Sequence, residues 1–110
     1  MGIIRCNGKC SDCFFREAHR THSVYVVEAE RIGLTKIGKA ANPKERLYAH
    51  KRMHRSSRLI AYWVVGCEPK ALGAEKVALK MMDPRSRVHG DWFAVPGKLV
   101  ARWVGGLFSA

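Results

Sequence analysis

The chain has 110 residues, which leaves room for one domain. Its 20 lysines and arginines against 9 acidic residues give a formal net charge of +11. This basicity excludes an ordinary neutral metabolic enzyme as the default interpretation and favours a polyanionic partner, because phosphates release counterions when they are neutralised. Hydrophobic residues make up 47% of the chain, which excludes a disordered basic tail.

The sequence predicts a protein with no membrane partner that stays in the reducing cytoplasm. No apolar run approaches the ~20 residues that a membrane span needs, and the N-terminus does not read as a secretory signal. Because disulfides are rare in reducing compartments, the cysteines are expected to be thiols or metal ligands.

The composition changes near residue 22, which predicts a Cys/His-rich segment over residues 1–22 and a globular domain with a C-terminal helix over residues 23–110. The first segment holds a Cys-x3-Cys-x2-Cys run followed by two histidines, and it would form a structural Zn²⁺ knuckle of Cys3His type. Its candidate ligands are Cys6, Cys10, Cys13 and one of His19 and His22.

These cysteines have two other interpretations. The thiols can be free in a loose N-terminus without any metal. The spacing also matches the radical-SAM iron–sulfur motif, but Asp12 stands where that family has an aromatic residue, and the chain is too short for the barrel of such enzymes. Cys67 is expected to be a small residue at the end of a strand.

The first two elements are expected to form a β-hairpin. Residues 23–30 and 34–40 are β-branched and aromatic runs separated by a turn at Gly33. Gly38 interrupts the second run and marks a bulge or a close approach of the backbone to another group.

A helix is predicted from Asn42 to about residue 53. Asn42 can cap the helix, Pro43 suits its first position, and Glu45 completes a capping box. The later elements are an apolar third strand expected to be central (59–65), a helix from Pro69 that Asp83-Pro84 ends, a short strand (92–95) and a last helix weakened by two glycines (99–108). The expected fold class is α/β, a small three-stranded antiparallel sheet flanked by helices.

Glu75 is a carboxylate within an apolar stripe of the second predicted helix. Its neighbours three and four residues away all are apolar: Ala71, Leu72, Ala78 and Leu79. A buried carboxylate needs a cation or a proton. Glu75 is therefore one of two things. It is a boundary residue that reaches solvent or pairs with a distant arginine, or it is a ligand for a divalent metal such as Mg²⁺.

The first helix carries Arg46 and His50 four residues apart, hence on one face. Arginine clamps phosphate oxygens and histidine can hold a phosphate oxygen or move a proton, although a solvated basic face is the commoner outcome. The expected nucleic-acid contacts also include a basic cluster beyond this pair and two residues of the hairpin: Gly38, Lys39, Lys51, Arg52, Arg55 and Arg58.

Four segments together resemble a known family. VYVVE, LTKIGKA, NPKERLYAH and AEKVALK, in this order, resemble the GIY-YIG nuclease superfamily, and more closely its phage and bacterial branch with a K-I-G second motif. RVHGDWFAV resembles the R-x-x-GEWF ending of that branch, so that the resemblance covers about residues 23–95.

The resemblance implies roles for individual residues. Tyr25 would activate the attacking water, and Gly38 would bring the backbone close to the site. Arg46 would steady the scissile phosphate, with His50 beside it, and Glu75 would bind the single divalent metal, Mg²⁺ or Mn²⁺. Lys36 departs from the pattern by replacing the second motif's tyrosine, and its cation can lower the pKa of the attacking water.

These observations predict a divalent-metal-dependent endonuclease that hydrolyses DNA phosphodiester bonds. One alternative is a non-catalytic nucleic-acid-binding module on a nuclease-like fold, and a weaker one is an interaction adaptor built around the cysteines. Charge does not distinguish DNA from RNA.

Overall fold

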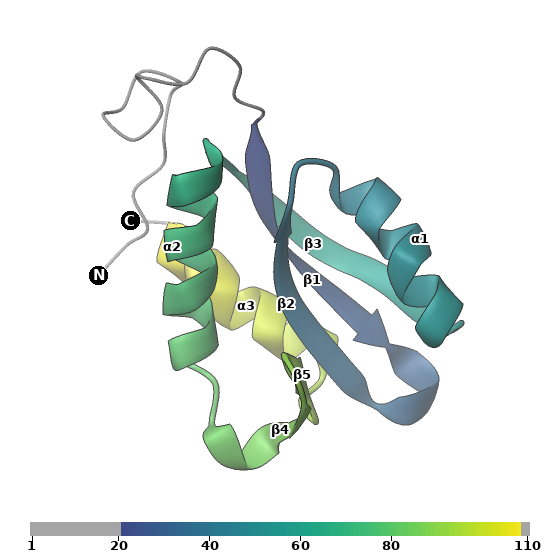
Figure 1. Ribbon diagram of the computed structural model, residues 1–110. Helices are drawn as coiled ribbons and strands as arrows, with labels where there is room; N and C mark the ends of the chain where they lie inside the picture. The colour runs from purple at the N-terminus through teal and green to yellow at the C-terminus, as the bar shows by residue number, and fades with distance from the viewer. Residues whose placement is uncertain (1–20, 109–110) are drawn as a thin grey trace.

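The computed structural model describes residues 21–108, in which three α-helices and two short 3₁₀ helices accompany five strands. In chain order the elements are β1 (His22–Ala29), η1 (Glu30–Ile32), β2 (Leu34–Ala40), α1 (Pro43–Met53), β3 (Ser57–Gly66), α2 (Glu68–Lys80), η2 (Pro84–Ser86), β4 (Arg87–His89), β5 (Trp92–Phe93) and α3 (Gly97–Phe108) (Figure 1).

The β1–β2 hairpin predicted from the sequence is confirmed. The two strands pair antiparallel, with Tyr25 opposite Gly38 and Val26 opposite Ile37. Gly33 follows the short η1 turn with φ of 65°, a left-handed conformation that glycine adopts without steric cost. This register fixes which hairpin side chains share a face of the sheet.

The prediction of a three-stranded sheet is wrong, because the sheet has five strands in the order β3-β1-β2-β5-β4. The two additional strands form a small hairpin that pairs with β2 through Thr35 opposite Phe93 and Lys36 opposite Trp92. β4 and β5 have only 3 and 2 residues. Strands this short contain too few residues to show the alternation that identifies a strand in sequence.

The third strand is an edge strand, whereas its apolar sequence predicted a central position. β1 is central among the long strands, because it pairs with both β2 and β3. Along β3, Tyr62 and Val64 remain 47% and 49% exposed, whereas Ile60 and Trp63 pack against the core. Leu59 packs on the opposite side, in the core beneath α1, so the apolar run reflects the helices that flank this strand rather than a central place in the sheet.

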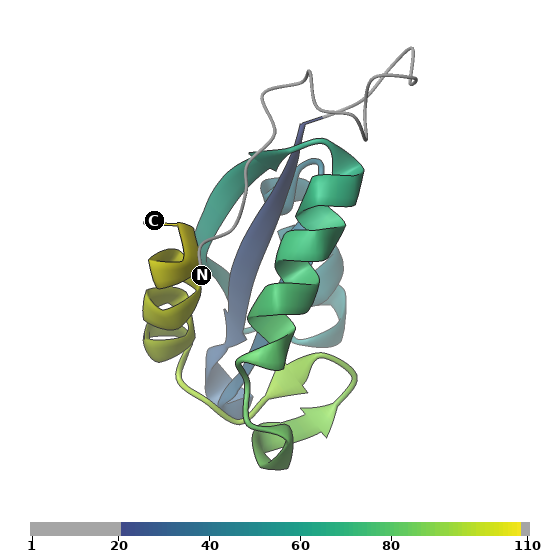
Figure 2. The ribbon, with the colours of Figure 1, turned by 90° about the vertical axis from the view of Figure 1, so that its left-hand side faces the viewer.

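Helices cover both faces of the sheet, with α1 and α2 on opposite sides (Figures 1 and 2). The larger core lies on the side of α2 and α3, where Val24 and Val26 of β1 meet Val100 and Val104 of α3. The smaller core lies on the side of α1 and contains Tyr25, Val27, Ala29, Leu34 and Trp92. None of the helices within residues 21–108 has the length and apolar character of a membrane span.

The first and last predicted helices both form. Asn42 caps α1 as predicted, and its side chain accepts a hydrogen bond from the Glu45 amide at 3.2 Å. α3 continues through both of its glycines, which were expected to weaken it. A Cβ at Gly105 would lie 3.3 Å from Trp63, whose ring stacks on Phe108 at 5.4 Å between centroids, so that a small residue lets the helix pack closely on β3.

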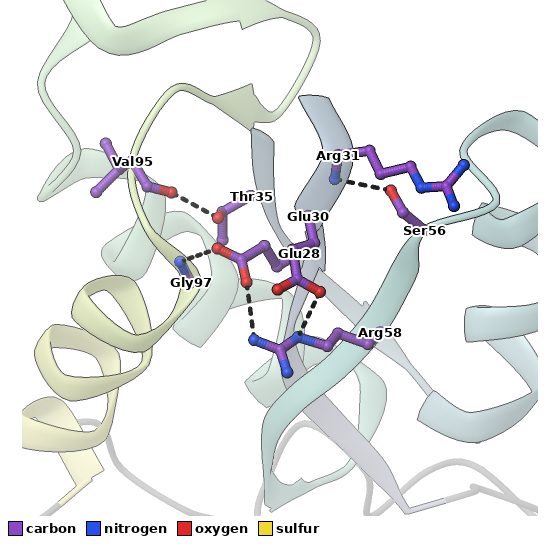
Figure 3. Close-up of polar contacts among 8 residues, drawn as sticks. All are labelled: Glu28, Glu30, Arg31, Thr35, Ser56, Arg58, Val95 and Gly97. Atoms are coloured by element: carbon purple, nitrogen blue, oxygen red, sulfur yellow. Dashed lines mark hydrogen bonds and ion pairs between the residues drawn. The ribbon is translucent and has the colours of Figure 1, made fainter. Parts of the chain in front are cut away.

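Glu28 connects the central strand to the start of α3 (Figure 3). Its carboxylate accepts a hydrogen bond from the Gly97 amide at 2.8 Å and one from Arg58 at 3.3 Å, and its side chain is 14% exposed. An acceptor at the first turn of a helix satisfies an amide that has no partner within the helix. Nearby, the Thr35 hydroxyl donates to the Val95 carbonyl at 2.6 Å.

We expect Glu28→Ala to lower the free energy of unfolding by about 1–3 kcal/mol, because it leaves the partly buried Gly97 amide and Arg58 without this acceptor. Urea unfolding followed by circular dichroism measures the loss. Glu30→Ala is the matched control, because Glu30 is 65% exposed and lies 3.9 Å from Arg58. Equal losses in the two variants would contradict the role given to Glu28.

Candidate functional site

The centre of the candidate site is a contact between Tyr25 of β1 and His50 of α1. Their polar atoms, Tyr25 Oη and His50 Nε2, lie 2.8 Å apart. Tyr25 is 1% exposed and His50 is 8% exposed. The two residues come from separate elements, so the packing of α1 on the sheet brings a phenol and an imidazole into hydrogen-bond distance.

Gly38 leaves the space that the Tyr25 ring fills. It is opposite Tyr25 in the hairpin register, and a Cβ built on Gly38 would overlap the ring and hydroxyl of Tyr25. The sequence interpretation of Gly38 as a position of close approach is therefore confirmed, and the approaching group is an aromatic side chain. As a buried residue under Tyr25, Gly38 itself offers little surface for nucleic acid.

His50 is held in its neutral form by its surroundings. Burial, together with the smaller effects of the positive charges of Lys36, Arg46 and His54, lowers its pKa from the usual 6.5 to about 4. The Trp92 ring meets His50 edge-on, with centroids 5.7 Å apart. A neutral imidazole can accept the Tyr25 proton when its own proton is on Nδ1.

Tyr25 stays protonated at neutral pH. Burial raises the pKa of its phenol above the usual 10.0, whereas a hydrogen bond and the positive charge of Arg46 lower it. The negative charges of Glu75 and Asp91 raise it again. The phenol is thus surrounded by one guanidinium and two carboxylates that come from distant parts of the chain.

Glu75 lies at the border of the buried stripe of α2, which is formed by Ala71, Ala74 and Ala78. It is half-buried, and its carboxylate is close to β2. Burial and the charge of Asp91 raise its pKa, while Lys39, Lys36 and a backbone hydrogen bond from Lys39 lower it. Glu75 is therefore a boundary residue that is partly open to solvent, with Lys36 and Lys39 close to its carboxylate.

Lys36 and Asp91 form an ion pair at the edge of the site. Their Nζ and Oδ2 atoms lie 4.0 Å apart, and the Lys36 side chain is only 19% exposed. The sequence predicted a role for Lys36 but not for Asp91, which was seen only as part of the GDWF segment. The missing information was the pairing of β5 with β2, which brings Asp91 to Lys36 from 55 residues further along the chain.

A hollow of about 410 Å³ adjoins the site between the end of β2 and the start of α1. Lys39 and Arg46 supply its positive charges, and Lys39 also lies 3.5 Å from Glu68. Alanines leave the space open. The complete lining is Lys39, Ala40, Ala41, Asn42, Glu45, Arg46 and Ala49.

The structure separates the predicted basic cluster into two parts. Lys51, Arg52 and Arg55 are exposed at the end of α1 and just after it. Arg58 instead pairs with Glu28 at 3.3 Å and with Glu30 at 3.9 Å, on β3. We call Lys51, Arg52 and Arg55 the α1 basic surface.

The described residues fit an ion such as Mg²⁺, which takes few protein ligands, better than a metal held by three or four side chains. Within residues 21–108 no group of three or more His, Cys, Asp or Glu side chains is arranged to hold a metal. Mg²⁺ needs only one or two carboxylates when water and substrate phosphates supply its other ligands. Glu75 meets that requirement. Of the predicted zinc ligands, His22 begins β1, and Cys6, Cys10, Cys13 and His19 lie outside the described residues.

We expect the stability of the protein to fall as the pH drops from about 6.5 to 4, by up to about 1.4 kcal/mol per pH unit from His50 alone. The unfolded chain takes up a proton at His50 near its usual pKa, whereas the folded chain does so only near 4. Well above pH 6.5, His50 is neutral in both states and contributes no slope. Urea unfolding at several pH values measures the effect.

The control is His50→Gln, which keeps a hydrogen-bonding side chain but cannot titrate. It should show a shallower loss of stability over the same pH range. Equal slopes for the two proteins would contradict the assignment of a neutral His50.

A family comparison identifies the domain. The model of the T5orf172 domain matches residues 22–107, most of the chain. No curated protein and no solved structure matches the chain. The GIY-YIG assignment made from short motifs is therefore wrong, because the matching family is a different one, although both are nuclease-like. The T5orf172 domain is associated with nuclease-like and DNA-binding function, and this chain belongs to the T5orf172 domain family.

Proposed function

We propose that the protein is a divalent-metal-dependent endonuclease that hydrolyses DNA phosphodiester bonds. The observation that carries the proposal is the buried Tyr25–His50 contact at 2.8 Å, which is surrounded by the charges of Arg46, Lys36 and Glu75. Titratable groups with shifted pKa values cluster at functional sites in proteins. The association of the family with nuclease-like function supports the same conclusion.

Tyr25 and His50 would orient and activate the attacking water. With the phenol donating to His50 Nε2, the lone pairs of Tyr25 Oη accept a hydrogen bond from water. As the water oxygen attacks phosphorus, its proton moves to Tyr25, and the Tyr25 proton moves to His50. A bound phosphodiester adds negative charge beside His50, which offsets the cations that lower its pKa in the free protein.

Arg46 would hold the scissile phosphate. It is exposed, it contributes both a hydrogen bond and positive charge at Tyr25, and it lines the adjoining hollow. A guanidinium binds two phosphate oxygens at once, which fixes phosphorus relative to the water. The hollow, with Lys39 and the amino end of α1, suits a neighbouring phosphate of the same strand.

Glu75 would hold the divalent ion, Mg²⁺ or Mn²⁺, from the α2 side of the site. Such an ion, when bound, stabilises negative charge on the leaving oxygen as a Lewis acid. Lys36 and Lys39 lower the pKa of Glu75 and so oppose the rise that burial and Asp91 cause. An ionised carboxylate is the form that binds a cation.

The α1 basic surface would follow the DNA backbone beyond the cleaved bond. Lys51, Arg52 and Arg55 are exposed, and the chain carries a net charge of +11. Contacts of this kind give affinity without sequence readout.

We expect Glu75→Ala and Arg46→Ala each to slow nicking of supercoiled plasmid DNA in Mg²⁺ by about 100-fold or more, because each removes stabilisation of charge that develops in the transition state. Gel electrophoresis of time courses measures the rate. Asp83→Asn and Arg102→Ala are the matched controls, because both residues are exposed on other elements, η2's cap and α3.

If the parent protein cleaves and both variants cleave as fast as it does, the assignment of these residues fails. If the parent protein binds DNA in a salt-sensitive, metal-independent way and cleaves no plasmid, branched or single-stranded substrate, the protein is a binding module rather than an enzyme.

We expect the salt dependence of DNA binding to separate the two kinds of basic residue. Replacing Lys51 and Arg52 by alanine should reduce the slope of log K against log salt concentration by about 0.9 for each lost phosphate contact. Arg58→Ala should leave the slope nearly unchanged, because Arg58 is paired with Glu28 and Glu30. Fluorescence anisotropy with a labelled duplex measures the slope, and a larger change for Arg58→Ala would contradict this division.

A further inference from the structure

Asp91 occupies an unusual place, on the tight turn that joins β4 and β5. Gly90 before it has φ of 51°, a left-handed conformation that closes the turn. Because Trp92, the next residue, is paired with Lys36 of β2, the turn brings Asp91 directly to the side chain of Lys36. The strand register thus determines this contact.

Asp91 lies between two cations. Its Oδ2 is 4.0 Å from Lys36 Nζ and its Oδ1 is 3.9 Å from Arg87, with the Asp91 side chain 39% exposed. Arg87 is 51% exposed, whereas Lys36 is 19% exposed. The contact with Lys36 is therefore the more enclosed of the two, and screening by solvent weakens it less.

Lys36 needs such a partner to stay in place. Its charge acts on both His50 and Glu75, so the ammonium lies among the groups of the site. A lysine side chain also has several rotatable bonds, and burial without a partner would favour conformations that reach solvent.

We propose that Asp91 is a positioning residue that holds the Lys36 ammonium beside the Tyr25–His50 pair, where it polarises the attacking water. This inference rests on the proposed nuclease function for its catalytic meaning. The contact itself, and the location of Lys36, have a test that does not depend on cleavage. The Asp91 carboxylate holds the Lys36 ammonium, and it acts on the reaction only through this lysine.

The first test follows the His50 imidazole by NMR during acid titration of the full chain. The Lys36 charge lowers the pKa of His50, so Lys36→Met should raise the titration midpoint above that of the parent protein. Asp91→Asn should also raise the midpoint, because the released ammonium moves away. A direct effect of losing the Asp91 charge would have the opposite sign, since removing a nearby anion disfavours the imidazolium.

Three further proteins make this test specific. Asp91→Glu should restore the parent midpoint, and Asp91→Asn should change nothing more when Lys36 is already methionine. Arg87→Gln, the matched control, removes the other cation beside Asp91 and should leave the midpoint unchanged. A midpoint that falls or stays constant in Asp91→Asn overturns the proposal, and so does an equal shift in the Lys36→Met background.

The second test measures plasmid nicking by the same proteins in Mg²⁺. Asp91→Asn should lower kcat about tenfold or more with KM almost unchanged, and Asp91→Glu should recover most of the rate. A loss confined to KM, or a loss that multiplies with that of Lys36→Met, overturns the positioning role. If the parent protein does not nick DNA, the proposed function fails, while the NMR result still decides whether Asp91 holds Lys36.

Discussion

The site depends on one buried hydrogen bond, between Tyr25 of the central strand and His50 of α1. Its atoms meet at 2.8 Å with the tyrosine ring in the space beside Gly38, and this is possible because that cross-strand neighbour has no Cβ. A side chain at Gly38 would displace the ring, the ring would displace α1, and Arg46 on that helix would move with it. One missing Cβ therefore determines the relative position of two elements of the site.

The charges around this hydrogen bond are arranged so that neither partner ionises alone. Burial disfavours both phenolate and imidazolium, and the neighbouring cations help lower the pKa of His50 to about 4. Of the two carboxylates, Asp91 lies 4.0 Å from Lys36, and Glu75 is affected by the charge of the same lysine. The pair is thus neutral at physiological pH and polarised by charges that the sheet and helices hold in place.

Local patterns in the sequence predicted much of this structure and missed what depends on distant pairing. The hairpin and the capped helix α1 follow from spacing within a few residues, and the structure contains both. The apolar stripe predicted around Glu75 is buried at Ala71 and Ala78, whereas Leu72 is 37% exposed. The five-stranded sheet, the edge position of β3 and the contact of Asp91 with Lys36 depend on which strands become neighbours. Strands of 2 and 3 residues carry no periodic signal, and an apolar strand at an edge resembles a central one until the covering helices are known. The family was missed for a related reason, since short motifs match several nuclease families.

The small β4–β5 hairpin is attached to the sheet by only two residue pairs, Thr35 with Phe93 and Lys36 with Trp92. Its attachment comes mainly from side chains, because Trp92 is 6% and Phe93 is 1% exposed and each belongs to one of the two cores. Trp92 also meets His50 edge-on, and Asp91, the residue before it, pairs with Lys36. The electrostatic character of the site is therefore coupled to the packing of two aromatic rings on opposite faces of the sheet.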